Sequence, residues 1–175
     1  MTEISDFLVV GSGVAGLSFA LRVAEKGTVT VITKKERAES NTNYAQGGIA
    51  SVFSPDDSYD FHIQDTLRVG MGLCNLEAVC LIVREGPERV RELEEWGVGF
   101  THQGGKENPY ELGREGGHSR NRIVHAKDRT GMVIEQALLE KVRDHPKIQV
   151  KENHVAVELI TEHQLKERKE RKGEK

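Results

Sequence analysis

The hydrophobic pattern at the start of the chain predicts a strand, a helix and a second strand. An apolar run at residues 7–10 leads into a glycine-rich turn at residues 11–16, after which apolar residues recur at helical spacing as far as Ala24. A second apolar run follows at residues 28–32. We therefore expect strands over about 6–10 and 28–33 and a helix over about 14–26. A crossover of this kind implies parallel strands and an α/β fold.

The glycine-rich turn has the pattern G-x-G-x-x-G, in which each glycine has a separate role in binding a dinucleotide. Gly11 allows the tight turn, Gly13 lets the backbone approach a pyrophosphate, and Gly16 lets the helix lie close to the sheet. The phosphates would lie at the positive end of the helix. Glycine-rich turns also occur where backbone merely packs on backbone, but the flanking strand and helix patterns favour a nucleotide site.

The end of the second predicted strand is unusual for an NAD site. Most such folds place an acidic residue there to bind a ribose hydroxyl, whereas this chain has Thr33, Lys34 and Lys35. Thr33 at the ribose and Lys34 near charge would still suit an adenosine diphosphate group. The alternative is that both lysines are simply solvated.

Two polar, glycine-containing segments lack any periodicity. Residues 40–50 predict a loop that suits a flat polar ligand such as a flavin ring, with an ordinary connector as the alternative. Residues 97–126 predict a long loop that faces an anionic ligand or a flavin, in which Arg114, Arg120 and Arg122 supply positive charge and Glu115 adds one negative charge. A surface ion-pair cluster is the alternative there. His118 and His125 are not spaced like a standard pair of metal ligands, so we expect no metal.

The remaining segments predict a scaffold of helices and strands. One helix is capped by Asp57 or Ser58, and its apolar side includes Phe61, Thr66, Leu67 and Val69. Another helix covers 76–85. Gly86 and Pro87 break it, and a third helix follows with Val90 and Leu93 buried. A fourth helix, capped by Asp128 or Thr130, runs to about Arg143, before strands at 148–151 and 154–160. The charged tail at 161–175 predicts disorder or a frayed helix.

Composition excludes several classes of function. The chain has 175 residues, which suits one domain, and its net charge of -3 gives no reason to expect nucleic acid or an anionic membrane as a partner. No apolar run is long enough to span a membrane, and residues 1–3 do not resemble a signal peptide. We therefore expect a cytoplasmic protein in which Cys74 and Cys80 are reduced.

Three separated motifs resemble those of the L-aspartate oxidases, which belong to the succinate dehydrogenase and fumarate reductase group of flavoproteins. The motifs are residues 11–18, residues 44–50, and residues 114–119 continuing to 125–131, within a resemblance that covers about 6–160. The resemblance implies a Rossmann-like FAD-binding domain of the glutathione reductase type, incomplete here. Residues 1–160 would be its N-terminal portion, and residues 161–175 a tail.

The resemblance also implies which residues bind FAD. The implied cofactor-binding residues are Gly11, Ser12, Gly13, Val14, Ala15 and Gly16 at the pyrophosphate, Lys34 at the adenosine side, and Asn41, Thr42, Asn43, Tyr44, Ala45, Gln46, Gly47 and Gly48 along the flavin. Asn41 stands where the succinate dehydrogenase relatives have a histidine joined covalently to the flavin. Asparagine cannot form that bond, so FAD would be bound non-covalently.

Glu115 is the residue implied to face the substrate amino group. A carboxylate there would favour L-aspartate over a dicarboxylate without an ammonium group. The implied reaction, part of NAD biosynthesis, oxidises L-aspartate to iminoaspartate by hydride transfer to FAD, with oxygen or fumarate as the final acceptor. No catalytic residue is assignable, because the family's other substrate-binding residues lie beyond position 160.

We therefore expect the chain alone to be inactive and to bind FAD weakly at best, unless a complementing chain supplies the missing segments. The alternatives are a fumarate reductase-like FAD oxidoreductase and a non-catalytic FAD-binding fragment that needs a partner chain.

Overall fold

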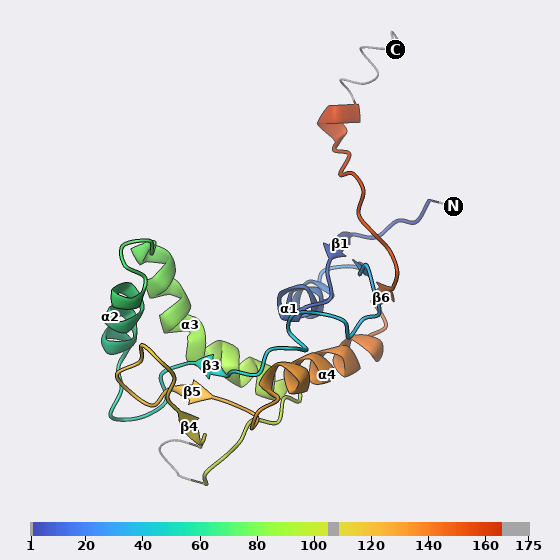
Figure 1. Cartoon of the computed structure of the whole chain (residues 1–175). Helices are drawn as coiled ribbons and strands as arrows, with labels where there is room; N and C mark the ends of the chain where they lie inside the picture. The colour runs from blue at the N-terminus through green and yellow to red at the C-terminus, as the bar shows by residue number, and fades with distance from the viewer. Residues whose placement is uncertain (1, 105–108, 166–175) are drawn as a thin grey trace.

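The molecule has two lobes, and each lobe contains a small sheet with helices packed against it (Figure 1). The computed structural model describes residues 2–104 and 109–165. The first lobe contains β1 (Phe7–Val10), α1 (Val14–Val23), β2 (Val29–Ile32), α4 (Thr130–Arg143) and β6 (Ile148–Lys151). The second lobe contains β3 (Ile49–Ala50), α2 (Tyr59–Val69), β4 (Leu112–Gly113), β5 (Ile123–Val124) and the first half of α3 (Leu76–Glu95).

The sheet of the first lobe is parallel, with strand order β1-β2-β6. Val29 of β2 is paired with Phe7 of β1 on one side and with Ile148 of β6 on the other. Side chains alternate between the faces, so that Val29 and Val31 pack in the core with α1. On the other face of β1, Leu8 and Val10 are 56% and 65% exposed. The predicted strand–helix–strand unit is confirmed, although α1 ends three residues earlier than expected.

The predicted break at Gly86 and Pro87 is wrong, because α3 is one helix of 20 residues that contains Pro87. A proline in a helix interior removes one hydrogen bond and costs about 3 kcal/mol. Packing at both ends of α3 offsets this cost. Val79 and Val83 pack with α2, whereas the second half of α3 packs in the main core with α1 and α4.

The predicted N-cap of α2 at Ser58 is confirmed, and so is the packing of Leu67 against the α2–α3 core, but two other residues of the predicted apolar side are exposed. Ser58 Oγ accepts a hydrogen bond from the N–H of Phe61. The buried residues are His62, Ile63 and Asp65, while Phe61 and Val69 are 41% and 59% exposed. The inward face contains two polar residues, so the apolar pattern of the sequence does not identify it.

Residues 97–126 form part of a second sheet and are not simply a loop. The antiparallel order is β3-β5-β4, and an isolated bridge joins His102 to Tyr110. Strands of two residues are too short to leave a period in the sequence.

The predicted caps of α4 are also wrong. Arg129 is the N-cap residue, and its side chain makes no capping hydrogen bond. Thr130 Oγ1 accepts a hydrogen bond from the N–H of Ala126.

The predicted strand at residues 154–160 is absent. The N–H of His154 donates to the carbonyl of Thr33 at 2.9 Å, but the following residues make no ladder with any strand of the described chain. Val157 is 93% exposed, because an alternating pattern forms a strand only where a neighbouring strand is available to pair with it.

In the predicted tail, residues 162–165 form a short helical turn, and residues 166–175 lie outside the described residues. None of the described helices combines the length and apolar character that crossing a membrane requires.

Candidate functional site

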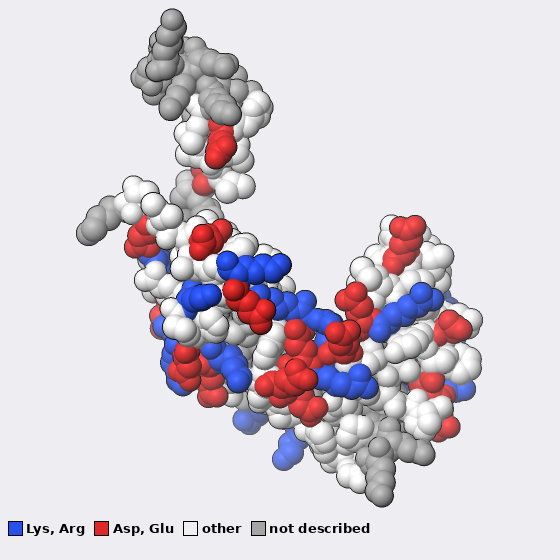
Figure 2. Space-filling view, turned by 180° about the vertical axis from the view of Figure 1, so that it is seen from behind, with Lys and Arg blue, Asp and Glu red and all other residues white. Residues whose placement is uncertain are grey.

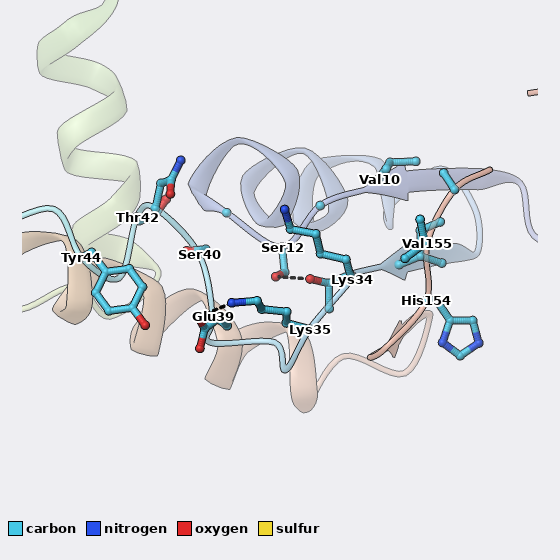
Figure 3. A pocket seen from close by; sticks show the side chains of 16 residues that line it. Val10, Ser12, Lys34, Lys35, Glu39, Ser40, Thr42, Tyr44, His154 and Val155 are labelled. Carbon is cyan, nitrogen blue, oxygen red and sulfur yellow. Dashed lines mark hydrogen bonds and ion pairs between the residues drawn. The ribbon is translucent and has the colours of Figure 1, made fainter. Parts of the chain in front are cut away.

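A cavity of about 550 Å³ lies at the carboxyl ends of β1 and β2, where ligands bind in open α/β sheets (Figure 3). Three segments far apart in the sequence line it. They are the β1–α1 turn, the segment after β2 as far as Tyr44, and the start of the segment after β6; the lining residues are Val10, Gly11, Ser12, Gly13, Ile32, Thr33, Lys34, Lys35, Glu39, Ser40, Asn41, Thr42, Tyr44, His154, Val155 and Ala156. The structure therefore brings the predicted glycine turn together with four of the later predicted cofactor residues, Lys34, Asn41, Thr42 and Tyr44.

The glycine turn has the geometry that its sequence predicts. Gly11 has φ +108°, a conformation that other residues rarely adopt, and its N–H donates to the carbonyl of Ile32 at 2.8 Å. A Cβ atom on Gly16 would lie 2.1 Å from the carbonyl oxygen of Gly11. Only glycine at both positions lets α1 begin so close to β1.

The start of α1 offers hydrogen-bond donors to an anion. The backbone N–H groups of Gly13 and Ala15 have no hydrogen-bond partner within the described chain. The N–H of Val14 donates to Thr42 Oγ1 at 3.1 Å. Free N–H groups and the positive end of the helix dipole favour a phosphate group at this point.

The side chains of Ser12 and Thr33 are directed toward the protein. Ser12 is 3% exposed, and its hydroxyl lies 3.1 Å from Thr33 Oγ1 and 2.9 Å from the carbonyl oxygen of Arg37. Ser12 can therefore bind a phosphate only through its backbone. Lys34 points into the cavity, whereas Lys35 is paired with Glu39 at 2.7 Å (Figure 3). The hydrogen bond from Lys35 lowers the pKa of Glu39.

Residues 40–48 form a loop as predicted, whereas residues 49–50 of the predicted loop form β3. Helix α4 holds residues 40–45 of this loop. Ser40 Oγ donates to Glu135 Oε2 at 2.5 Å, and the N–H of Gly131 donates to the carbonyl of Ala45 at 3.0 Å. A Cβ atom on Gly131 would lie 1.9 Å from the carbonyl oxygen of Thr42. The close packing of α4 therefore fixes the backbone that lines the first cavity.

A second cavity, of about 230 Å³, lies at the other end of the predicted cofactor loop. It is lined by Gln46, Gly47, Gly48, Gly113, Arg114, Glu115, Ile123, His125 and Lys127. Glu115 Oε1 lies 3.2 Å from the position that a Cβ atom on Gly47 would occupy. The predicted flavin segment and the predicted substrate-facing carboxylate are thus neighbours, although 68 positions separate them.

His125 and Lys127 belong to the second cavity, and the sequence did not assign them a role in a ligand site. His125 Nδ1 is buried without a hydrogen-bond partner among the described residues. Lys127 has φ +52°, which directs the chain from β5 toward α4. Both residues fall inside the third motif, but nothing in their spacing distinguishes them from the scaffold around them.

The prediction that Arg122 provides charge for a ligand is wrong. Arg122 is completely buried, donates twice to Asp57 at 2.8 Å, and donates to Asp65 at 2.9 Å. Asp65 also accepts from the N–H and hydroxyl of Ser119, both at 2.7 Å. Burial alone would raise the pKa of Asp65, but the hydrogen bonds from Ser119 and Arg122 lower it to about 2. This ion cluster anchors the segment that begins with Glu115.

The other two arginines differ from each other. Arg120 donates to the carbonyl of Asp56 and lies over the ring of Phe61, so it has a structural role, whereas Arg114 lines the second cavity.

The histidines near the ion cluster have structural contacts. His118 contacts Arg122, and burial lowers the pKa of the neighbouring His62 to about 4. Across residues 2–104 and 109–165, no three His, Cys, Asp or Glu side chains lie close enough together to hold a metal ion.

Comparison with known proteins identifies the family. The model of the family described as FAD binding domain matches residues 6–171. The chain belongs to this family. Its residues fit the cofactor, because a cavity lies beside the glycine turn, the N–H groups of Gly13 and Ala15 lack partners among the described residues, and the loop continues into a second cavity.

Similar proteins include L-aspartate oxidases from plants and bacteria. The chain is 54% identical over 160 residues to the chloroplastic L-aspartate oxidase 2-a of Nicotiana tabacum and 47% identical over 163 residues to the L-aspartate oxidase of Vibrio cholerae. Each match covers 91% of this chain but only 24% and 30% of those proteins. The chain therefore spans less than a third of the length of these relatives.

Solved structures show the same fold. A quinol fumarate reductase chain of E. coli matches 90% of this chain with a TM-score of 0.83 and 28% identity, over 27% of its own length. A Mycobacterium smegmatis Sdh1 chain matches 90% with a TM-score of 0.78 and 32% identity, over 29% of its length. The predicted α/β FAD-binding fold is confirmed.

Proposed function

We propose that this chain binds FAD non-covalently as the first part of an L-aspartate oxidase. The observation that supports this most directly is the course of residues 40–48. This one segment lines the first cavity, beside the glycine turn, and then the second cavity, beside Glu115. An extended cofactor with adenosine at one end, a pyrophosphate in the middle and a flat ring at the other end suits such a path.

Different residues of the chain would bind different parts of the cofactor. The N–H groups at the start of α1 would bind the pyrophosphate, Lys34 would lie at the adenosine side, and residues 41–48 would line the flavin. When bound, FAD supplies the acceptor for a hydride from the substrate. Asn41 lines the first cavity and lacks the ring nitrogen with which a histidine would bond to the flavin. The non-covalent binding of FAD follows from this residue.

Glu115 would orient the substrate. Its carboxylate lies in the second cavity with Arg114, Lys127 and His125 around it. An ammonium group placed beside Glu115 gains a favourable charge interaction, and the neighbouring cations suit the carboxylates of the same molecule. A dicarboxylate without an ammonium group would be repelled by Glu115. This combination favours L-aspartate over succinate.

We also predict the final electron acceptor, a complementing chain and the location of the protein. Oxygen or fumarate would be the final acceptor, and a complementing chain would carry the residues that complete the site. A cytoplasmic location is our expectation from the sequence, although the plant relatives are named as chloroplastic.

Equilibrium dialysis of the purified chain against FAD, read by visible absorbance, tests the proposal at the weak affinity that we expect of the chain alone. We expect more flavin on the protein side than in the buffer, and acid precipitation should release it into the supernatant, because no covalent bond is present. Equal flavin on both sides would contradict FAD binding. Flavin that stays with the precipitate would contradict non-covalent attachment.

Substrate selectivity needs the completed enzyme. In a chain joined to the remaining part of a bacterial relative, we expect anaerobic L-aspartate to bleach the flavin, and Glu115→Gln to reduce the preference for L-aspartate over succinate by at least tenfold, since the charge interaction with the ammonium group is lost. Equal preference in both proteins would instead favour a fumarate reductase-like enzyme.

A further inference from the structure

A buried carboxyl group lies beneath the loop that lines the first cavity. Glu135, on the second turn of α4, has no exposed surface. Its Oε2 accepts the hydrogen bond from Ser40, whereas its Oε1 has no hydrogen-bond partner within the described chain. Removing an ionised carboxylate from water without a cation or a full set of donors is very costly. The surroundings of Glu135 therefore favour its neutral form.

No charged group compensates for this burial. Helix α4 packs on α1, on β6 and on the loop, yet among the described residues only burial and the hydrogen bond from Ser40 affect the pKa of Glu135, and no titratable or charged side chain of those elements contributes. Burial raises the pKa, and the bond from Ser40 opposes it in part. A neutral carboxyl group still accepts a hydrogen bond through its carbonyl oxygen.

The contact of Glu135 is part of a short chain of hydrogen bonds. The N–H of Asn43 donates to Ser40 Oγ at 3.3 Å, and the hydroxyl of Ser40 donates in turn to Glu135. The turn closed in this way contains Asn41 and Thr42, and Thr42 Oγ1 contacts the start of α1. Figure 3 shows Ser40 and Thr42 on the loop that runs along α4.

A second contact lies one helical turn earlier on the same face of α4. Gly131 and Glu135 are four residues apart, and the N–H of Gly131 bonds to the carbonyl of Ala45. The loop is therefore held at both ends, at Ser40 by a side chain and at Ala45 by the backbone.

We propose that Glu135, in its neutral form, is a positioning residue that holds residues 40–45 in the conformation that binds FAD. This inference rests on the proposed function. Glu135 does not line either cavity and acts through Ser40.

Substitutions of Glu135 separate its shape from its charge. Glu135→Gln keeps an oxygen that accepts from Ser40 and cannot ionise, so we expect FAD affinity equal to that of the unaltered chain at pH 5. Glu135→Leu removes the acceptor, and we expect the dissociation constant for FAD to rise about tenfold. Gln136→Leu, on the exposed side of the same helix, is the matched control and should bind FAD unchanged.

The dependence of FAD affinity on pH tests the protonation state of Glu135, because a purely structural role would not change this dependence. As the pH rises through the elevated pKa of Glu135, the unaltered chain should lose FAD affinity, because a buried anion disrupts the loop. Glu135→Gln should lose less affinity over the same range, so that it binds FAD more tightly than the unaltered chain once Glu135 ionises. Parallel profiles for the two proteins would overturn the proposal.

The test is a fluorescence titration of the full chain and its variants with FAD between pH 5 and pH 8.5, together with amide hydrogen exchange of the FAD-free chain. In exchange, we expect the Asn43 amide to lose protection in Glu135→Leu and to keep it in Gln136→Leu. Unchanged protection of Asn43 in Glu135→Leu would overturn the positioning role. Failure of the unaltered chain to bind FAD would contradict the proposed function, and the exchange result would still decide the role of Glu135.

Discussion

Arg122 has no surface exposed to solvent, and its guanidinium group contacts two carboxylates. Its charge is therefore used inside the protein. The second carboxylate, Asp65, is also the acceptor for Ser119, so that one side chain of α2 connects the ion cluster to the segment that carries Glu115. Removing one member of such a cluster leaves the others buried without compensation.

We expect Asp65→Ala to lower the free energy of unfolding by about 3–5 kcal/mol, because Arg122 would keep a buried charge with one partner lost. Urea denaturation measures this change. Asp60→Ala is the control, since Asp60 is exposed on the same helix and its loss should cost less than about 1 kcal/mol. Equal losses in the two variants would contradict a structural role for the cluster.

The same carboxylate makes stability depend on acid pH. The pKa of Asp65 is lowered to about 2 from its usual value of 3.8, so its stabilising effect is complete above pH 4 and is lost as the pH falls toward 2. The loss attributable to this group is about 2 kcal/mol. Urea midpoints of the unaltered chain and Asp65→Asn should converge over this interval. A constant difference between them from pH 5 to pH 2 would show that Asp65 does not titrate as described.

Among the elements, α4 has the most direct effect on the candidate site. Its first turn packs so closely on residues 42–45 that a single methyl group at Gly131 has no space. We expect Gly131→Ala to displace this loop, to destabilise the chain by about 1–3 kcal/mol and to weaken FAD binding. Thermal unfolding and FAD titration check both effects. Gly99→Ala is the control, because no atom lies within 4 Å of the added methyl group, and it should leave FAD binding unchanged.

The sequence predicts an element well where local pattern and tertiary packing agree. The strand–helix–strand unit at residues 7–32 has both an apolar period and a glycine-rich turn, and the unit is confirmed together with the steric roles of Gly11 and Gly16. Helix α3 was not, because Pro87 is a local signal to stop that packing of both halves outweighs.

For the candidate site, the same distinction holds. Gly11, Gly13 and Glu115 belong to motifs that can be read locally. The roles of Asp65 and Glu135 depend on contacts with Ser119 and Ser40, more than 50 and 90 positions away, which no local pattern reveals.

At the scale of the whole molecule, the two cavities are lined by different lobes and joined by residues 40–48. Under the proposed function FAD would occupy both cavities, whereas ADP would occupy only the first. We expect saturating FAD to raise the midpoint of thermal unfolding by more than ADP does, and ADP to compete with FAD, because a ligand stabilises in proportion to its binding free energy. Equal shifts would show that the second cavity does not take part in binding.

On the face shown in Figure 2, acidic and basic side chains are interspersed over both lobes. This arrangement agrees with the net charge of -3 and provides no continuous basic surface on that face. The proposed binding of FAD would therefore gain nothing from a continuous basic surface on that face and would depend on the groups inside the cavities.

Because α3 contributes one half to each lobe, neither lobe has a complete set of packing partners without it. Melting of this helix at either end would remove core contacts at the other. The two lobes should consequently unfold in a single cooperative transition. The only tryptophan, Trp96, lies at the end of α3 against the main core, so its fluorescence and the helical signal of the whole chain should change at the same denaturant concentration.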